Sequence, residues 1–183
     1  SAIGLHPHAM LHRCGQQAFG WPKDNFIGDN IQRNDPAENW ADFFCKRRLA
    51  PQLEIARKNG IRMPDAQPLL ASVERILASH QPSPSLLHGD LWSGNTAFLE
   101  DGTPVVFDPA CYYGDRETDL AFTEFFGGFP AVFYRAYEDA WPLESGYAER
   151  KRIYNLYHLL NHANLFGGSY IGQAQQEIRS IVS

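Results

Sequence analysis

Hydrophobic side chains recur every three or four positions along the second half of the chain, which is the period of an amphipathic helix. The clearest case is the stretch 147–166, whose apolar positions form one continuous stripe: Ile153, Leu156, Tyr157, Leu160 and Ala163. Because the stripe is unbroken, we expect it to face the core and not a partner protein. Shorter stretches with the same period flank it, and the predicted helices are 130–140, 147–166 and 169–182.

The first half of the chain has the same period with more interruptions. The spacing predicts a weak helix within residues 5–14 and longer helices within 35–59 and 64–80. Pro51 lacks an N–H donor and crowds the preceding turn, so we expect the second of these helices to kink or split one or two residues before it. Three aromatic residues of that helix share one face and are predicted to lie in the core: Trp40, Phe43 and Phe44.

Strand signals are short and lie in the middle of the chain. Residues 85–87 predict one strand, and residues 96–107 contain two apolar runs around a turn with Gly102, which is typical of a β-hairpin. Residues 15–37 are rich in Gly, Pro, Asn and Asp, which predicts a loop-rich segment that forms another hairpin. The predicted fold is mostly α, of the α+β class: a helical bundle with a short β-hairpin, forming a single domain over residues 1–183.

Polar side chains converge on the open end of the hairpin predicted at 96–107. Asn95 precedes its first strand and Asp108 follows its second. Residues directly opposite in an antiparallel pair lie roughly 4.5 to 5.5 Å apart at Cα, so these two side chains should share one small volume. Asp90 lies on a glycine-containing loop just before Asn95 and can face the same volume. Carboxylate and amide oxygens suit one divalent cation there.

An Asp that acts as a base, followed by an Asn and an Asp that hold magnesium, is the arrangement of kinase catalytic centres. Here residues 87–95 read Leu-His-Gly-Asp-Leu-Trp-Ser-Gly-Asn, and residues 108–121 read Asp-Pro-Ala-Cys-Tyr-Tyr-Gly-Asp-Arg-Glu-Thr-Asp-Leu-Ala. These segments resemble the fructosamine (ketosamine) kinase family, within the protein-kinase-like and aminoglycoside phosphotransferase superfamily. Residues 19–28, 40–49 and 165–168 also match its pattern, so the resemblance covers nearly the whole chain.

The resemblance implies that the intact enzyme transfers the γ-phosphoryl group of ATP to the 3-hydroxyl of a fructosamine or ribulosamine, free or protein-bound, with Mg²⁺ as cofactor. In this interpretation Asp90 is the catalytic residue, which orients the attacking hydroxyl and takes its proton late. Asn95 and Asp108 are the magnesium ligands. His88 and Asp119 support the catalytic loop.

Three further residues are candidates for contact with the substrate. Protein kinases have a Lys two residues after the catalytic Asp, whereas this chain has Trp92. Its indole is either a flat face for a sugar ring or a packing anchor for the loop. Asp24 and Asn25 lie in the loop-rich segment, which the resemblance places near the cleft between two lobes.

The resemblance also implies a second lobe. Kinases of this kind need a Gly-rich strand, turn and strand over the phosphates, a strand Lys and a helix Glu that pairs with the Lys. No such pattern precedes residue 88. We therefore expect the chain to be the C-terminal, catalytic-loop lobe of a kinase-like fold, with the N-terminal nucleotide-binding lobe missing, and to be inactive alone.

The net charge limits the classes of partner, and the spacing of the cysteines bears on the cellular compartment. The net charge of -5 gives no basic field for nucleic acid or an anionic membrane, and no run of apolar residues is long enough to predict a membrane span. Cys14, Cys45 and Cys111 show no paired spacing, so free thiols in a cytoplasmic protein are expected. His8 and His12 have helical metal spacing, but no acid completes a site, so we expect both to be solvated.

Two alternatives remain open from the sequence. An aminoglycoside or choline-type kinase would share Asp90, Asn95 and Asp108, and a substrate screen separates it from a ketosamine kinase. A non-catalytic kinase-like binding module is the alternative of another class. An upstream Gly-rich strand with a strand Lys would exclude it.

Overall fold

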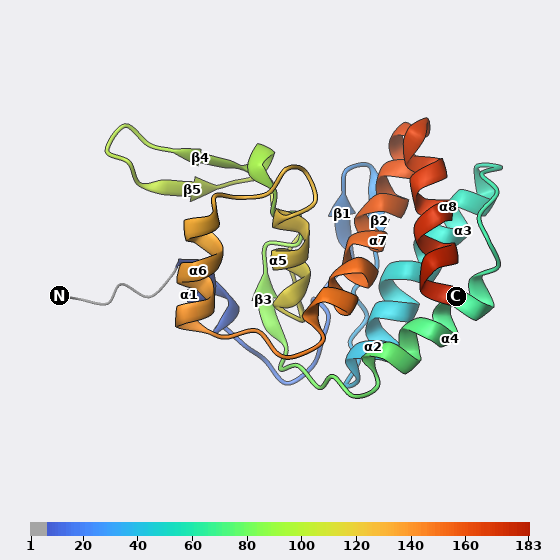
Figure 1. Cartoon of the computed structure of the whole chain (residues 1–183), viewed down its shortest axis with the longest axis horizontal. Coiled ribbons are helices and arrows are strands. Elements are labelled where there is room, and N and C mark those ends of the chain that lie inside the picture. Colours follow the sequence, from blue (N-terminus) through green and yellow to red (C-terminus); the bar gives the residue numbers. More distant parts are fainter. Residues whose placement is uncertain (1–6) are drawn as a thin grey trace.

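The structure of the protein is a computed structural model, and it describes residues 7–183. Helices make up about 51% of the described residues and the strands form small antiparallel sheets, so the mostly helical α+β class is confirmed (Figure 1). In chain order the elements are α1 (Pro7–His12), β1 (Asn25–Ile27), β2 (Asn30–Gln32), α2 (Trp40–Phe43), a π-helical segment η1 (Phe44–Leu49), α3 (Ala50–Lys58), α4 (Ala66–Leu77), β3 (Ser85–Leu87), a 3₁₀ turn η2 (Ser93–Asn95), β4 (Thr96–Phe98), β5 (Pro104–Val106), β6 (Tyr112–Gly114), α5 (Glu117–Thr123), α6 (Ala131–Ala140), α7 (Tyr147–Phe166) and α8 (Ser169–Val182).

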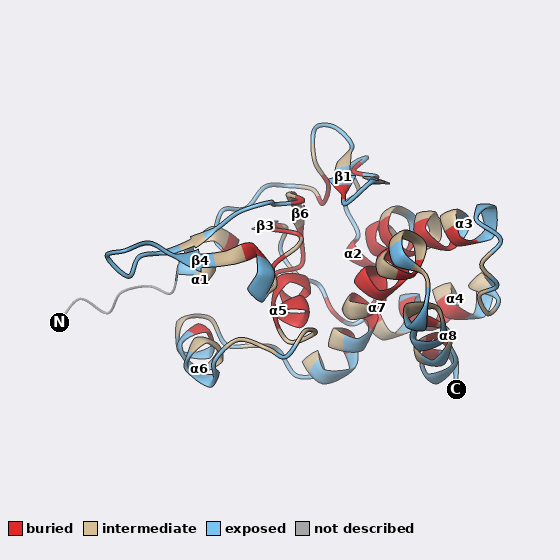
Figure 2. Cartoon of the chain, turned by 90° about the horizontal axis from the view of Figure 1, so that it is seen from above, coloured by how far each residue is buried: buried red, intermediate tan, exposed pale blue. Residues whose placement is uncertain are grey.

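The main core lies between α7 and the helices around it. α7 packs against α3, α5 and α8, and its predicted stripe is buried along its length. The aromatic residues Trp40, Phe43 and Phe44 are each at most 2% exposed and belong to the same core, as predicted. Figure 2 shows these buried faces directed toward one another, while α1 and α6 form a smaller group on the other side of α5. The bounds predicted for α7 and α8 agree with the structure.

The helix predicted to kink or split before Pro51 changes its hydrogen bonding at that point. Over Phe44–Leu49 the backbone forms π-helical turns, and the Ala50 N–H donates to the Cys45 carbonyl, five residues back. Pro51 then lies in the first turn of α3, and the Arg47 carbonyl four residues before it accepts a hydrogen bond from the Arg48 guanidinium at 3.0 Å. The helix therefore continues through a wider turn without breaking its path.

Three two-stranded antiparallel sheets hold the loops in place. β1 pairs with β2 and β4 pairs with β5, which confirms both predicted hairpins. β3 was also predicted, but its partner β6 was not, because the pairing of Leu86 with Tyr113 joins residues far apart in the sequence. This third sheet connects the chain before the Asp90 loop to the chain after Asp108.

The contacts of α4, the end of α5 and the burial of two α1 histidines complete the packing. α4 packs against α2, η1, α7 and α8. α5 ends at Thr123. His12 is 1% exposed, so its predicted solvation is wrong, and His8 is half-buried. None of the helices within residues 7–183 is long and apolar enough to cross a membrane.

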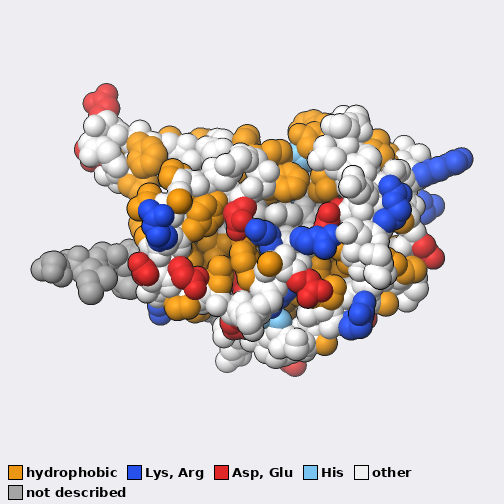
Figure 3. Space-filling model, in the orientation of Figure 1, with side chains coloured by type: hydrophobic (Ala, Val, Ile, Leu, Met, Phe, Trp, Pro, Cys, Tyr) orange, Lys and Arg blue, Asp and Glu red, His pale blue; other side chains and the backbone are white. Residues whose placement is uncertain are grey.

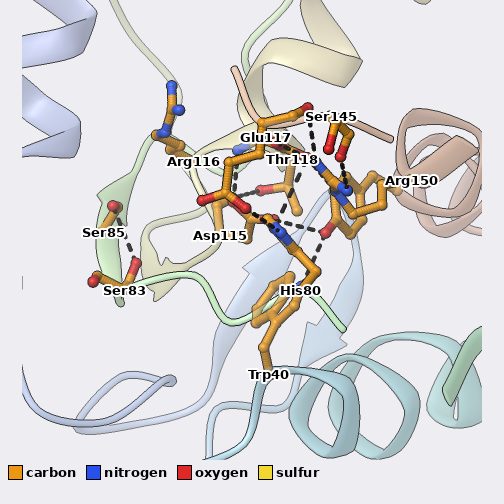
Figure 4. Close-up of polar contacts among 12 residues, drawn as sticks. Trp40, His80, Ser83, Ser85, Asp115, Arg116, Glu117, Thr118, Ser145 and Arg150 are labelled. Atoms are coloured by element: carbon orange, nitrogen blue, oxygen red, sulfur yellow. Dashed lines mark hydrogen bonds and ion pairs between the residues drawn. The ribbon is translucent and has the colours of Figure 1, made fainter. Parts of the chain in front are cut away.

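A buried polar network joins the end of α4 to the starts of α5 and α7 (Figure 4). The Asp115 carboxylate contacts His80 Nε2 at 2.7 Å, accepts a hydrogen bond from the Tyr154 hydroxyl at 2.6 Å and caps α5 by accepting from the Glu117 N–H at 3.0 Å. Glu117 in turn forms a two-pronged ion pair with Arg150, at 2.7 and 2.8 Å. Because the acids already have these partners, we interpret the cluster as a structural brace.

Replacing Arg150 with Met should destabilise the protein strongly. The side chains of Arg150 and Glu117 are only 7% and 1% exposed, and removing the cation leaves a buried carboxylate without its counter-charge. We expect the free energy of unfolding to fall by about 3–5 kcal/mol in urea titrations. The matched control is Arg152→Met, which removes an exposed partner of Glu177 and should cost about 0–1 kcal/mol. Equal losses for both variants would contradict the role of the buried pair.

Candidate active site

The open end of the β4–β5 hairpin meets the Asp90 loop through backbone contacts. The Phe107 N–H donates to the Asn95 carbonyl at 3.1 Å, so Asn95 lies opposite Phe107 and one residue out of step with Asp108. His88 lies between the two segments. Its Nδ1 accepts from the Asp90 N–H at 3.3 Å, and its Nε2 lies 3.0 Å from the Phe107 carbonyl. Since one ring nitrogen accepts, the other donates, and His88 ties the Asp90 loop to the residue before Asp108.

Asp119 binds the backbone of the same loop. Its carboxylate accepts from the backbone N–H of His88 at 2.7 Å and of Gly89 at 2.9 Å, and it contacts His12 Nε2 at 3.2 Å. His12 Nδ1 in turn lies 2.7 Å from the Tyr137 hydroxyl. Burial alone would raise the pKa of Asp119, but these hydrogen bonds and the neighbouring histidines hold it below its usual range. Asp119 is therefore an ionised, buried acceptor for the loop backbone.

Gly89 lets the loop approach the segment after Asp108 closely. Its φ is +80°, and a Cβ at this position would lie 2.1 Å from the Ala110 carbonyl oxygen. The Ala110 N–H donates to the His88 carbonyl at 2.8 Å. Any larger residue at position 89 would push the two segments apart.

Asp90 and Asn95 are in direct contact. The Asn95 side-chain N–H₂ donates to Asp90 Oδ2 and to the Asp90 carbonyl, each at 2.9 Å. Burial raises the pKa of Asp90, and the hydrogen bond from Asn95 opposes this shift. The contact also settles the direction of the Asn95 amide, because its nitrogen faces Asp90 and its oxygen accepts no hydrogen bond from the described residues.

Asp108 combines exposure with an unusual backbone. It is exposed, and within residues 7–183 it is the one non-glycine residue with a positive φ, +56°. Such conformations cost free energy and occur preferentially at functional sites. Its carboxylate forms no hydrogen bond or ion pair with the described residues, and its charge contributes to the raised pKa of Asp90. Free oxygens of Asn95 and Asp108 next to the Asp90 carboxylate fit the donor set that a hard divalent cation prefers.

Trp92 is half-buried beside the loop. Its ring lies 5.3 Å from the ring of Phe126, and a Cβ at Gly94 would come within 2.2 Å of the indole. The indole thus packs over Gly94. The structure agrees with a packing anchor and leaves part of the ring accessible.

Asp24 and Asn25 are engaged within the chain. Asp24 accepts from the Asn34 N–H at 2.8 Å and pairs with Arg33, and the hydrogen bond from Asn34 lowers its pKa despite partial burial. Asn25 donates to the Cys111 carbonyl at 2.8 Å and accepts from Gln32. These bonds fasten the β1–β2 hairpin to the segment that follows Asp108.

His158 is a neighbour of Asp90 that the sequence analysis did not identify. It lies on α7 with its Nδ1 4.0 Å from Asp90 Oδ1. The predicted stripe treated α7 only as core. A signal that could have pointed to it is the placement of His158 and His162 four residues apart, which puts both on one side of the helix.

The three cysteines within the described residues are free, as predicted. Cys45 is buried and Cys14 exposed, while Cys111 is half-buried and burial raises its pKa. Hydrophobic side chains are also exposed along the β4–β5 hairpin, with Phe98 76% and Phe107 47% exposed. Figure 3 shows this hairpin projecting from the body of the molecule, with acidic side chains at its tip.

Comparisons with known proteins identify relatives of this chain. A probable ketoamine kinase from Synechocystis sp. is 54% identical over 172 residues, which cover 93% of this chain and 58% of that protein. A probable ketoamine kinase from Vibrio parahaemolyticus is 51% identical over 176 residues, covering 96% and 61%. The chain therefore spans about three fifths of the length of these relatives.

Two solved structures are similar to this chain over nearly its whole length. The crystal structure of a protein named "putative fructosamine-3-kinase" from Haemophilus somnus superposes with a TM-score of 0.92 at 38% identity, covering 96% of this chain and 61% of that one. One of the same name from Thermobifida fusca gives 0.87 at 32% identity, covering 98% and 64%. The sequence model described as fructosamine kinase matches residues 6–183. The chain belongs to the fructosamine kinase family.

Proposed function

We propose that the protein of which this chain forms part is an ATP- and Mg²⁺-dependent ketosamine 3-kinase, which phosphorylates a sugar hydroxyl of free or protein-bound fructosamines. The observation that carries the proposal is the joint placement of Asp90, Asn95 and Asp108 at the open end of one hairpin, braced by Asp119. Membership of the fructosamine kinase family supports the acceptor class.

Each of these residues has a role in the proposed reaction. Asp90 would accept a hydrogen bond from the acceptor hydroxyl, orient it and take its proton late in the transfer. Its raised pKa favours proton uptake at that stage. Asn95 fixes Asp90 with its amide nitrogen and offers its oxygen to the metal together with Asp108. Bound Mg²⁺ would supply charge neutralisation on the phosphate oxygens.

The supporting and substrate-facing residues follow from the contacts already described. His88 and Asp119 would keep the Asp90 loop in register with Asp108. The accessible part of the Trp92 ring would face the sugar. We place Asp24 and Asn25 beside the acceptor as parts of the wall and not as direct ligands, because their polar groups have partners within the chain.

We further propose that this chain is the catalytic-loop lobe of the fold and that a nucleotide-binding lobe completes the site. A lobe over the β4–β5 hairpin would cover the exposed Phe98 and Phe107. A cytoplasmic location remains a prediction. Aminoglycoside or choline-type kinases use the same three polar residues, so the acceptor has to be tested directly.

The test is a phosphotransfer assay with the full-length protein. With ATP, Mg²⁺ and N-α-blocked fructosyl-lysine, we expect a 3-phosphorylated product, identified by mass spectrometry and ³¹P NMR. Aminoglycosides and choline should not be phosphorylated at comparable kcat/KM. The 183-residue chain alone should show no turnover and weak ATP binding by calorimetry, since kinases bind nucleotide from both sides of the cleft.

Two results would contradict the proposal. Preferential phosphorylation of an aminoglycoside or choline would mean that the acceptor is of that class and not a ketosamine. Absence of ATP binding and turnover with every acceptor in the full-length protein would favour a non-catalytic module.

A further inference from the structure

His158 presents a buried nitrogen for which the described residues provide no partner. The side chain is 5% exposed, and its Nδ1 makes no hydrogen bond in the structure. A buried polar atom without a partner loses its hydration and gains nothing in return, which costs roughly 1–3 kcal/mol. A buried polar atom without a partner requires an explanation. In the cleft of an enzyme, a hydrogen bond to a bound ligand provides one.

Packing fixes the plane of the imidazole. The imidazole stacks on Phe122 with ring centroids 3.6 Å apart and planes inclined by 10°, and the Tyr157 ring meets it edge-on at 5.1 Å. On α7, the His158 carbonyl contacts His162 Nδ1 at 2.7 Å. Stacking thus fixes the plane of the ring, and in that plane Nδ1 lies 4.0 Å from Asp90 Oδ1.

The ring is neutral near pH 7, since burial lowers the pKa of His158 to about 3. A neutral imidazole carries one proton, on Nδ1 or on Nε2. Nδ1 faces Asp90 Oδ1, and a carboxylate oxygen attracts an N–H and repels a lone pair. This arrangement favours the proton on Nδ1.

His158 Nδ1 and Asp90 Oδ1 do not bond to each other directly. Nδ1 and Oδ1 are 4.0 Å apart, which is too long for a direct hydrogen bond. A single oxygen at hydrogen-bonding distance from both atoms would form its two hydrogen bonds at an angle of about 90° to each other. This angle is close to that between the substituents of a hydroxyl oxygen. The other carboxylate oxygen, Oδ2, is already occupied by Asn95, so Oδ1 is the one left for a substrate.

We propose that His158 is a second acceptor-binding residue, whose Nδ1–H donates a hydrogen bond to the sugar hydroxyl that Asp90 Oδ1 accepts from. This inference rests on the proposed function and adds a residue to it. The hydroxyl then has its proton directed to Asp90, one lone pair held by His158 and one lone pair free for in-line attack. In the transfer, this oxygen forms the bond to the γ-phosphorus, its proton passes to Asp90 and the bond to the β–γ bridging oxygen breaks to release ADP.

The first experiment needs no variant. The ¹⁵N shifts of the His158 ring in the full-length protein, labelled on histidine and assigned by comparison with His158→Asn, report which nitrogen carries the proton. We expect the Nδ1–H tautomer. An Nε2–H tautomer would overturn the proposal, whether or not the ketosamine kinase assignment holds.

The second experiment separates hydrogen bonding from packing. His158→Phe keeps a flat ring on Phe122 but removes the nitrogen, whereas His158→Asn places an N–H on the atom bonded to Cγ, as in Nδ1. We expect the phenylalanine variant to lose about tenfold in kcat/KM for the ketosamine with an unchanged KM for ATP, and the asparagine variant to recover most of it. Equal activity of His158→Phe and the wild type, or equal losses in both variants, would overturn the proposal.

A third comparison uses the ligand. By calorimetry, a 3-deoxy analogue should bind more weakly than the ketosamine to the wild type, and the difference should shrink in His158→Phe. The same difference in both proteins would mean that the hydroxyl does not contact His158. If the wild type binds and phosphorylates no ketosamine, the proposed function fails, and the tautomer measurement still decides on His158.

Discussion

Asp90→Asn in the full-length protein is expected to lower kcat for ketosamine phosphorylation by roughly 10²- to 10⁴-fold while the KM for ATP changes little. The substitution keeps the shape of the side chain, and its amide oxygen can still accept the hydrogen bond from Asn95. It removes the carboxylate that orients the attacking hydroxyl and receives its proton. Steady-state kinetics at saturating ATP, with ketosamine varied, provide the measurement.

The control for this variant lies on the same hairpin. Asp101 is exposed in the turn between β4 and β5, where its carboxylate accepts from the Thr103 N–H, so Asp101→Asn should keep the wild-type kcat. A small change in Asp90→Asn, within a factor of about three, would remove Asp90 from the reaction. A large rise in the KM for ATP would instead indicate that Asp90 contributes to nucleotide binding.

The helices that the sequence predicted best are those whose signals are local. α7 and α8 begin and end where the apolar period and the Gly167-Gly168 pair place them, because helical spacing and glycine act over a few residues. The β4–β5 hairpin was predictable for the same reason. The β3–β6 sheet was not, since no turn in the sequence links its two strands and their pairing depends on tertiary contacts.

The same distinction between local and long-range contacts applies to the residues of the candidate site. Asp90, Asn95 and Asp108 could be proposed from the sequence because they lie close together around a hairpin. His12 was expected in solvent, but Tyr137 and Asp119, more than a hundred residues away, enclose it. His158 was not singled out from the sequence, because it lies beside the apolar stripe of α7 and only the fold brings it to Asp90. Sequence patterns of this kind identify residues that act with their chain neighbours and miss those contributed by a distant helix.

Asp108→Asn should fail in a different way from Asp90→Asn. Asn adopts a positive φ more readily than most residues, so the backbone at +56° should persist. What is lost is one negative charge from the proposed magnesium site. We expect activity to fall together with Mg²⁺-dependent ATP binding, and high Mg²⁺ to restore part of both. Calorimetry of ATP binding and kcat/KM, each over a range of Mg²⁺ concentrations, provide the measurements.

The contrast between the two variants tests the roles and not only the importance of the residues. A ligand lost from the metal can be offset by a higher metal concentration, because mass action refills a weakened site. A lost proton acceptor cannot be replaced in this way. If Mg²⁺ restored Asp90→Asn but not Asp108→Asn, the base and the metal ligand would have to be exchanged. If neither substitution changed turnover or ATP binding, the phosphotransfer centre would lie elsewhere, and the hairpin that brings these residues together would be structural.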